Sequence, residues 1–193
     1  MESFGEKLKI FITDPHLSGG GQITYLCRLS QGLTKRGHKV IVGCKKGSIF
    51  VELAKTYNYE VIDGFYFKGG LRISTWIKDI SKFRKTLIEL NPDIVHVNGS
   101  QDHWTAVIAN YLLNNKHCII RTRHNTYKVS NHIFNKWLNV KATDFHIAVC
   151  DLVKNSLIEN NYFPEEIITA IHNGVDIEEF KPDEELRKKA RED

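Results

Sequence analysis

A chain of 193 residues has room for one large domain with a single hydrophobic core, and not for two domains of ordinary size. Its 41% hydrophobic and 26% charged residues are typical of a soluble globular protein, and the excess of 27 Lys and Arg over 23 Asp and Glu is mild. This balance suits phosphate-bearing small molecules or an anionic surface. It lacks the dense basic stripe expected of a protein that binds duplex nucleic acid, so no nucleic-acid partner is expected.

The sequence carries no signal for membrane insertion or export. No segment approaches the roughly 20 apolar residues of a membrane span. Residues 1–9 hold four charged residues and no apolar core, unlike a signal peptide. The four cysteines lie far apart and mostly in apolar runs, which favours buried reduced thiols. We therefore expect a cytoplasmic protein.

Apolar runs of strand length alternate along the chain with longer segments of helical period. The first half predicts strands at 8–14, 40–44, 59–63 and 93–97, and helices at 23–33, 48–56, 72–90 and 102–113. The second half predicts strands at 118–123, 145–149 and 167–171, and helices at 131–141 and 151–160. Asp151 is the expected N-cap of the last of these helices.

This alternation predicts an α/β fold, a Rossmann-like doubly wound parallel sheet. In such sheets, ligands bind at the carboxyl ends of the strands. The candidate site residues are therefore those that follow each strand: 14–21, 45–46, 98–103, 123–127, 150–151 and 172–176.

A glycine run, residues 18–21, lies between the first predicted strand and helix. Glycines let backbone N–H groups approach a phosphate closely, and the helix N-terminus adds partial positive charge. A tight turn that needs positive φ explains the run equally well. The run does not match the dinucleotide fingerprint, because Thr24 stands where the third glycine belongs, and no Gly-Lys-Ser/Thr follows as in a Walker loop.

Taken together, the spaced motifs resemble the retaining glycosyltransferases of the GT-B fold, in the large group 1 or family 4 class. The matching segments are Gly20-Gly21, Lys35-Arg36-Gly37-His38-Lys39-Val40, Asp93-Ile94-Val95-His96, His124, Ala148-Val149-Cys150, and Asn173-Gly174-Val175-Asp176 with Phe180. They cover nearly the whole chain in the family's order. Asn98 stands where the family has a second histidine, and this difference concerns the acceptor side.

The resemblance implies that this chain is the N-terminal, acceptor-binding half of a two-domain enzyme. Gly20 and Gly21 match the loop that approaches the donor diphosphate, and His124 matches the strand-end histidine that faces the reacting centre. His16, Asn98, Arg123 and Asn125 are the expected acceptor-binding residues. The implied substrates are a nucleoside diphosphate sugar and a hydroxyl acceptor, and the implied pathway is cell-envelope polysaccharide or lipopolysaccharide synthesis. The resemblance implies neither a cofactor nor a metal.

The resemblance also divides the chain. Residues 1–172 would form the Rossmann-like domain, and residues 173–193 a linker and the start of a C-terminal donor domain. Asn173, Gly174 and Asp176 match the hinge motif between the two. The donor-binding motifs of the family belong to that second domain, so the chain alone is expected to be inactive.

Two charged features invite sharper hypotheses. Arg121 and Arg123 alternate along a strand, and we expect only one to face the cleft; Arg123, next to His124, is the choice for an anionic acceptor group.

Helix 72–90 sets apolar residues against basic ones. It is either a surface helix docked on the sheet or a peripheral contact with an anionic membrane at its inner face.

Two other functions remain open from the sequence. An oxidoreductase that binds NADP would use the glycine run and Lys45-Lys46, and NADP would then raise its melting temperature. A stand-alone sugar- or lipid-binding module, which pairs with a separate donor subunit, would need no chemistry of its own. The fold class alone cannot separate these alternatives from the transferase.

Overall fold

Seven strands form one parallel sheet in the computed structural model, which describes residues 6–68, 73–159, 162–175, 177 and 180–192. The strands are β1 (Lys9–Asp14), β2 (Lys39–Lys45), β3 (Glu60–Phe65), β4 (Ile94–Val97), β5 (Cys118–Arg123), β6 (Phe145–Ala148) and β7 (Ile168–Ala170). The helices are α1 (Gly21–Lys35), α2 (Phe50–Tyr57), α3 (Ile73–Leu90), α4 (Ser100–Tyr111), α5 (Ile133–Lys136), α6 (Asp151–Ile158) and α7 (Glu184–Glu192). Two short elements complete the set, the π-helix η1 (Trp137–Lys141) and the 3₁₀-helix η2 (Glu165–Ile167).

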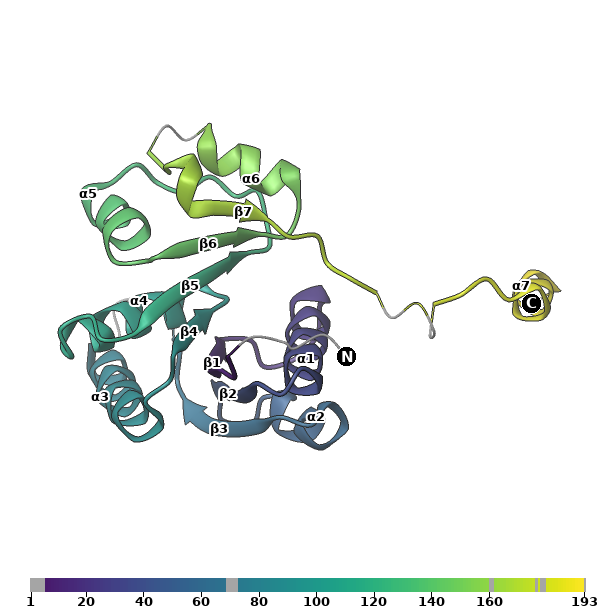
Figure 1. Ribbon diagram of the computed structural model, residues 1–193, viewed down its shortest axis with the longest axis horizontal. Coiled ribbons are helices and arrows are strands. Elements are labelled where there is room, and N and C mark those ends of the chain that lie inside the picture. The colour runs from purple at the N-terminus through teal and green to yellow at the C-terminus, as the bar shows by residue number, and fades with distance from the viewer. Residues whose placement is uncertain (1–5, 69–72, 160–161, 176, 178–179, 193) are drawn as a thin grey trace.

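The predicted α/β class and doubly wound sheet are confirmed. The strand order is β3-β2-β1-β4-β5-β6-β7, so the chain first builds outward from β1 in one direction and then returns to build from β4 in the other (Figure 1). The point between β1 and β4, where the winding reverses, is where open parallel sheets bind their ligands.

Alternate residues of the strands pack into two separate cores. Ile10, Ile12, Val40 and Val42 contact α1 and α2 on one face of the sheet. The neighbours Phe11, Ile41, Val95 and Ile119 contact α3 and α4 on the other face. This period of two is the pleat of a strand buried on both sides, and it explains the nearly continuous apolar runs of the sequence. A third cluster lies between β6, β7 and α6.

Several predicted boundaries need correction. Cys150 is the N-cap of α6 and Asp151 is its first helical residue, so the predicted cap was one residue late. The segment predicted as a helix over 131–141 begins at Ile133 and widens into a π-turn, in which the Ala142 N–H donates to the Trp137 carbonyl at 3.0 Å. Arg72, the predicted first residue of α3, lies outside the described residues.

The predicted apolar stripe of α3 is only partly buried. Phe83 and Leu87 are fully buried, whereas Ile73 and Ile77 are 63% and 59% exposed and Trp76 is 39% exposed. The last two turns of the helix therefore hold it on the sheet. Its first two turns present apolar side chains to solvent.

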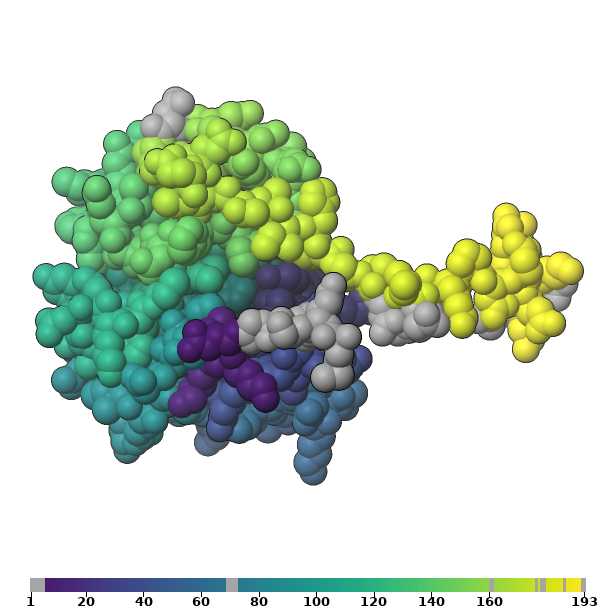
Figure 2. All heavy atoms as spheres, viewed as in Figure 1, coloured from purple at the N-terminus to yellow at the C-terminus, as the bar shows by residue number. Residues whose placement is uncertain are grey.

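Beyond β7 the chain leaves the sheet as an extended segment that leads to α7, which stands apart from the rest of the molecule (Figures 1 and 2). Asn173 and Gly174, predicted as hinge residues, are exposed in this segment, and Asp176 lies outside the described residues. The segment still contacts the body: Nε2 of His172 lies 3.0 Å from Oδ2 of Asp151 in α6, and the Arg28 guanidinium of α1 lies 5.1 Å from the centre of the Phe180 ring. None of the described helices is long and apolar enough to span a bilayer.

Candidate active site

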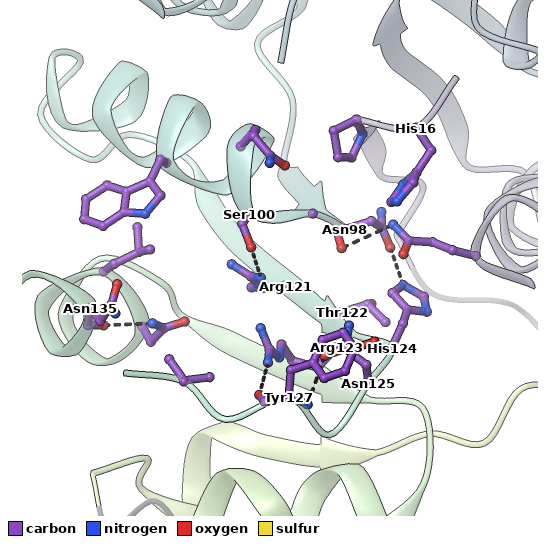
Figure 3. Close-up of a pocket in the computed structure, with 18 of the residues that line it drawn as sticks. His16, Asn98, Ser100, Arg121, Thr122, Arg123, His124, Asn125, Tyr127 and Asn135 are labelled. Carbon is purple, nitrogen blue, oxygen red and sulfur yellow. Dashed lines mark hydrogen bonds between the residues drawn. The ribbon is translucent and has the colours of Figure 1, made fainter. Parts of the chain in front are cut away.

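A polar cavity of about 430 Å³ opens at the carboxyl ends of β1, β4 and β5. Its lining comes from the loops after these strands, the start of α4 and the α5–η1 segment (Figure 3). The location agrees with the rule that ligands bind where the winding of the sheet reverses. Five predicted site residues line it: His16, Asn98, Arg123, His124 and Asn125.

His124 follows β5 at the rim of this cavity. Its ring packs edge-on against Tyr25 of α1, with ring centres 4.9 Å apart, and its Nε2 lies 3.2 Å from Oδ1 of Asn98. The amide orientation of Asn98 is fixed, because its Nδ2 donates to the Thr13 carbonyl, which can only accept. The Nε2 of His124 therefore carries the proton and donates, and Nδ1 is the unprotonated nitrogen of the neutral ring.

The environment keeps His124 neutral. Burial is the main cause that lowers the pKa of His124 to about 4, and the positive field of His16, Arg121 and Arg123 contributes to the same shift. A neutral imidazole at this position can orient and polarise a hydroxyl group, but it is too weak a base to hold a full proton at neutral pH.

A second layer of side chains supports this histidine from the α1 face. Thr122 of β5 contacts the Tyr25 hydroxyl at 3.2 Å and Nε2 of His96 at 2.6 Å. Burial lowers the pKa of His96 to about 4. His96 is thus a buried structural histidine beneath the site.

The loop after β4 is held from below by Asp102. The carboxylate of Asp102 accepts from the Thr13 hydroxyl at 2.9 Å and from the backbone N–H groups of Asn98 at 3.0 Å and Gly99 at 2.9 Å. Burial raises the pKa of Asp102 to about 6 despite these hydrogen bonds. The carboxylate therefore fixes the position of Asn98, and through it the orientation of His124.

His16 enters the cavity from the loop after β1. Both its Nδ1 and its backbone N–H lie 2.8 Å from Oδ1 of Asp14, whose other oxygen accepts from Nε2 of Gln22 at 2.6 Å. Asp14 is completely buried, while the His16 side chain is 49% exposed. The carboxylate thus fixes the ring of His16 with Nδ1 as the donor, and Nε2 remains the free nitrogen.

Gly20 and Gly21 lie at the N-terminus of α1, beside the cavity rather than in its described lining. Gly20 is the N-cap, with φ of 90°, a conformation that favours glycine, and no side chain caps the helix. The first N–H groups of α1 are therefore presented without a side-chain acceptor, as an anion site at a helix N-terminus requires.

The prediction that only one of the two arginines faces the cleft was wrong. Residues two apart on a strand share a face, so Arg121 and Arg123 both line the cavity. Ser100 lies within the predicted range 98–103, whereas sequence reasoning missed Gln22 and Trp104. Ser100 and Trp104 lie in the first turns of α4. Because the start of a helix that follows a strand faces the carboxyl edge of the sheet, the predicted position of this helix could have indicated Trp104 as well.

Among the described residues, no group of three or more His, Cys, Asp or Glu side chains is arranged to hold a metal ion. The nine histidines of the sequence are instead distributed among core positions, a helix cap, the cavity and the surface. The expectation of a reaction without a metal or cofactor stays a prediction.

The fold and the cavity at its switch point define one Rossmann-like half of a GT-B glycosyltransferase. The sequence model described as Glycosyltransferase Family 4 matches residues 19–179, and the chain belongs to this family. No protein in a search of curated sequences matches it.

Solved structures agree with this fold. A glycosyltransferase from Rickettsia africae is 22% identical with a TM-score of 0.78, over 97% of this chain and 50% of that one. HepE from Anabaena, solved with UDP and glucose, is 18% identical with a TM-score of 0.70, over 96% and 50%. A UDP-GlcNAc 2-epimerase from Neisseria meningitidis, bound to UDP-GlcNAc, is 14% identical with a TM-score of 0.63, over 86% and 46%. The chain thus spans about half the length of the structures it resembles.

Proposed function

We propose that this chain is the acceptor-binding half of a retaining glycosyltransferase, which moves a sugar from a nucleoside diphosphate sugar to a hydroxyl acceptor. The family membership supports the reaction class, and the Anabaena relative solved with UDP and glucose supports the type of donor. The observation that carries the proposal is the polar cavity at the switch point, with the neutral His124 fixed at its rim.

In this proposal, His124 orients the acceptor hydroxyl and the transferred sugar by hydrogen bonding. Front-face transfer with retention needs no strong protein base, because the departing diphosphate itself takes up the hydroxyl proton. A histidine whose pKa is lowered to about 4 suits that role, since it stays neutral throughout the working range of pH. His16, held by Asp14, contributes a second nitrogen to the same hydroxyl-bearing group.

The donor diphosphate would lie at the start of α1, where Gly20 and Gly21 let it approach the open N–H groups of the helix. The rest of the donor site would come from a second domain beyond the hinge at Asn173, Gly174 and Asp176. We therefore propose that residues 1–172 do not turn over a donor by themselves, and that no cofactor or metal takes part.

The surface of α3 supports a peripheral contact with an anionic membrane. Exposed Ile73, Trp76 and Ile77 share the helix with Lys78 and Lys85, an amphipathic combination that favours the interface of an anionic bilayer. A cytoplasmic enzyme placed at the inner face of the membrane would meet lipid-linked acceptors of cell-envelope polysaccharide or lipopolysaccharide synthesis there. Sedimentation with anionic and with neutral vesicles tests this contact, which is refuted if the protein stays in the supernatant with both.

An epimerase is the second function to test, because UDP-GlcNAc 2-epimerases share the fold. A transferase releases a nucleoside diphosphate only when it transfers its sugar to an acceptor or to water. An epimerase changes the configuration at C2 and leaves the sugar linked to the nucleotide or releases it as the epimer. The sugar product, analysed by NMR, therefore separates the two.

The test begins with the native polypeptide purified from its own cells, whose mass is measured first. A mass near twice 22.3 kDa would supply the donor half in the same chain, and a mass near 22.3 kDa directs the search to a partner subunit. The native protein is then assayed with a panel of nucleotide sugars for diphosphate release, with NADP as a competing ligand in thermal-shift measurements. Release of diphosphate with retained anomeric configuration supports the proposal, and an inverted product or NADP-specific stabilisation refutes it.

A further inference from the structure

Two arginines stand side by side on the floor of the cavity. Arg121 and Arg123 project from the same face of β5, and Figure 3 shows both guanidinium groups between the start of α4 and the loop that carries Tyr127. Arg121 is only 5% exposed, although it borders an open cavity. A guanidinium buried to this degree normally has an acidic partner, because burying an unpaired charge is costly.

The partners of Arg121 are neutral. Its Nη1 contacts Nδ1 of His103, and its Nη2 lies 3.4 Å from the Ser100 hydroxyl. The tautomer of His103 follows from Thr143, whose hydroxyl donates to the Leu138 carbonyl at 2.7 Å and so must accept from His103 Nε2 at 2.7 Å. Nδ1 of His103 is therefore the unprotonated nitrogen that accepts from Arg121. The histidine holds the guanidinium in place without neutralising its charge.

Neither arginine forms an ion pair with a carboxylate among the described residues. Within the described part of the chain, nothing accepts a hydrogen bond from the buried Nε of either. The charge of Asp102 acts on Arg121 without contacting it, and the two oxygens of Asp102 already accept three hydrogen bonds from Thr13, Asn98 and Gly99. Lys128 adds a third cation to a described lining that contains no Asp or Glu.

The charge of Arg121 persists despite this crowding. Burial and the neighbouring Arg123 lower the pKa of Arg121 to about 9, which still leaves the guanidinium protonated at neutral pH. The repulsion between the two groups is relieved when an anion binds between them. Paired planar guanidinium forks match the oxygens of a phosphate group well.

This site is separate from the expected position of the donor diphosphate. The open N–H groups of α1 follow β1, whereas the arginines lie on β5, two strands away in the sheet order β1-β4-β5. Two strand spacings are about 10 Å. Trp104 and the amides of Asn135 and Asn139 border the cavity beside the arginines, and an aromatic face with amide groups is a surface on which a sugar ring can stack and hydrogen-bond.

We propose that the acceptor carries a phosphate group, which Arg121 and Arg123 bind on the floor of the cavity while its sugar lies against Trp104. This inference rests on the proposed transferase function and names the substrate class of the same site. The phosphate belongs either to a phosphorylated saccharide or to a lipid headgroup that carries the saccharide.

The experiment measures binding of α-D-glucose 1-phosphate and of glucose to the native protein by calorimetry. Glucose 1-phosphate is expected to bind, and Arg121→Met and Arg123→Met are each expected to weaken it at least about tenfold, since a hydrogen bond between charged groups is lost. Lys116→Met is the matched control. It also removes one positive charge, but Lys116 precedes β5 and so lies at the amino ends of the strands, away from the cavity. Equal affinity for glucose, or arginine variants within twofold of the parent, would overturn the inference.

A measurement without variants covers the case in which an arginine substitution prevents folding. Glucose 1-phosphate should raise the melting temperature of the parent protein more than glucose does at the same concentration, because a ligand that binds only the folded state stabilises it. No difference between the two would overturn the inference.

Vesicles separate the two sources of the phosphate. The lipid headgroup is the source if the protein binds phosphatidylglycerol vesicles and if this binding is lost when glucose 1-phosphate is added and in the Arg123→Met variant. If glucose 1-phosphate binds and these vesicles do not compete with it, the source is a phosphorylated saccharide. Diphosphate release from nucleotide sugars is assayed separately: release without phosphate binding refutes only this inference, and phosphate binding without release refutes only the transferase proposal.

Discussion

Acidification should destabilise this protein steeply between pH 7.5 and pH 5.5, because several histidines are buried in the neutral form. Burial lowers the pKa of His96 and of His146 to about 4 and that of His103 well below its usual 6.5. In the unfolded chain all three titrate near pH 6.5. A group whose pKa is depressed on folding stabilises the fold above its unfolded pKa, and that stability is lost as the pH falls below it.

The size of the effect follows from proton linkage. At pH 5.5 an unfolded histidine is about nine-tenths protonated, while each of these three stays neutral in the fold. Each of them therefore lowers the free energy of unfolding of the protein by about 1.3 kcal/mol relative to pH 7.5. Asp102 acts in the opposite direction, because its pKa is raised to about 6 on folding, and it regains about 0.8 kcal/mol over the same interval. The expected net loss from these four groups is about 3 kcal/mol, a large part of the 5–15 kcal/mol typical of a folded domain, and His124, whose pKa is also lowered to about 4, adds to it.

Urea unfolding followed by tryptophan fluorescence at pH 7.5, 6.5 and 5.5 measures this loss. Repeating the series at 0.05 M and 0.3 M NaCl separates buried histidines from general repulsion between surface cations, since salt screens only the latter. His146→Gln should reduce the loss by about 1.3 kcal/mol, because one titrating group is removed. A change below about 1 kcal/mol, or one that disappears in 0.3 M salt, would refute the reasoning.

Three further predictions concern stability. Arg121→Met should raise the free energy of unfolding by about 1–3 kcal/mol in urea titrations, because it removes a buried cation without an acidic partner, and a lower value would show that His103 and Ser100 compensate the charge. Gly99→Ala should lower the free energy of unfolding by about 1–3 kcal/mol, because the new Cβ would lie 2.2 Å from Cγ of Pro15. Gly174→Ala is the control and should leave the melting temperature unchanged, because no atom lies within 4 Å of its Cβ. Equal effects of the two substitutions would contradict the packing argument. Asp79→Ala should cost about 2–4 kcal/mol, because the carboxylate accepts from the N–H groups of Tyr66 at 2.8 Å and Phe67 at 2.7 Å, and hydrogen exchange should rise first at those two amides.

The sequence was sufficient for the order and type of the elements of the sheet. The strands β1, β2 and β4 are apolar runs buried on both faces and bounded by turn residues, so local patterning and tertiary burial agree there. The site residues at the strand ends could be predicted for the same reason, since parallel strands bring their carboxyl ends to one edge. His16, Asn98, Arg123, His124 and Asn125 all line the cavity on this basis.

The rest depended on contacts that no local pattern encodes. The burial of Arg121 depends on His103 and Ser100, which reach it from a different element, α4. The exposure of Ile73 and Ile77 on α3 depends on how far the sheet extends beneath that helix, which helical periodicity alone cannot tell. The N-cap of α6 differed from the prediction because Asp and Ser side chains cap many helices but are not required when the backbone alone begins the helix.

The π-turn at η1 has a consequence for length variation in this segment. A π-turn holds one more residue than the α-helix that would otherwise connect the same two ends. Deleting Val140 should therefore be absorbed by conversion to a regular α-helix, rather than by a break in the chain. The residues on either side would keep their orientation, because the π-turn accommodates the one residue that the deletion removes. Asn135 would therefore stay in the cavity wall, and a protein of 192 residues would keep both its fold and this side of its site.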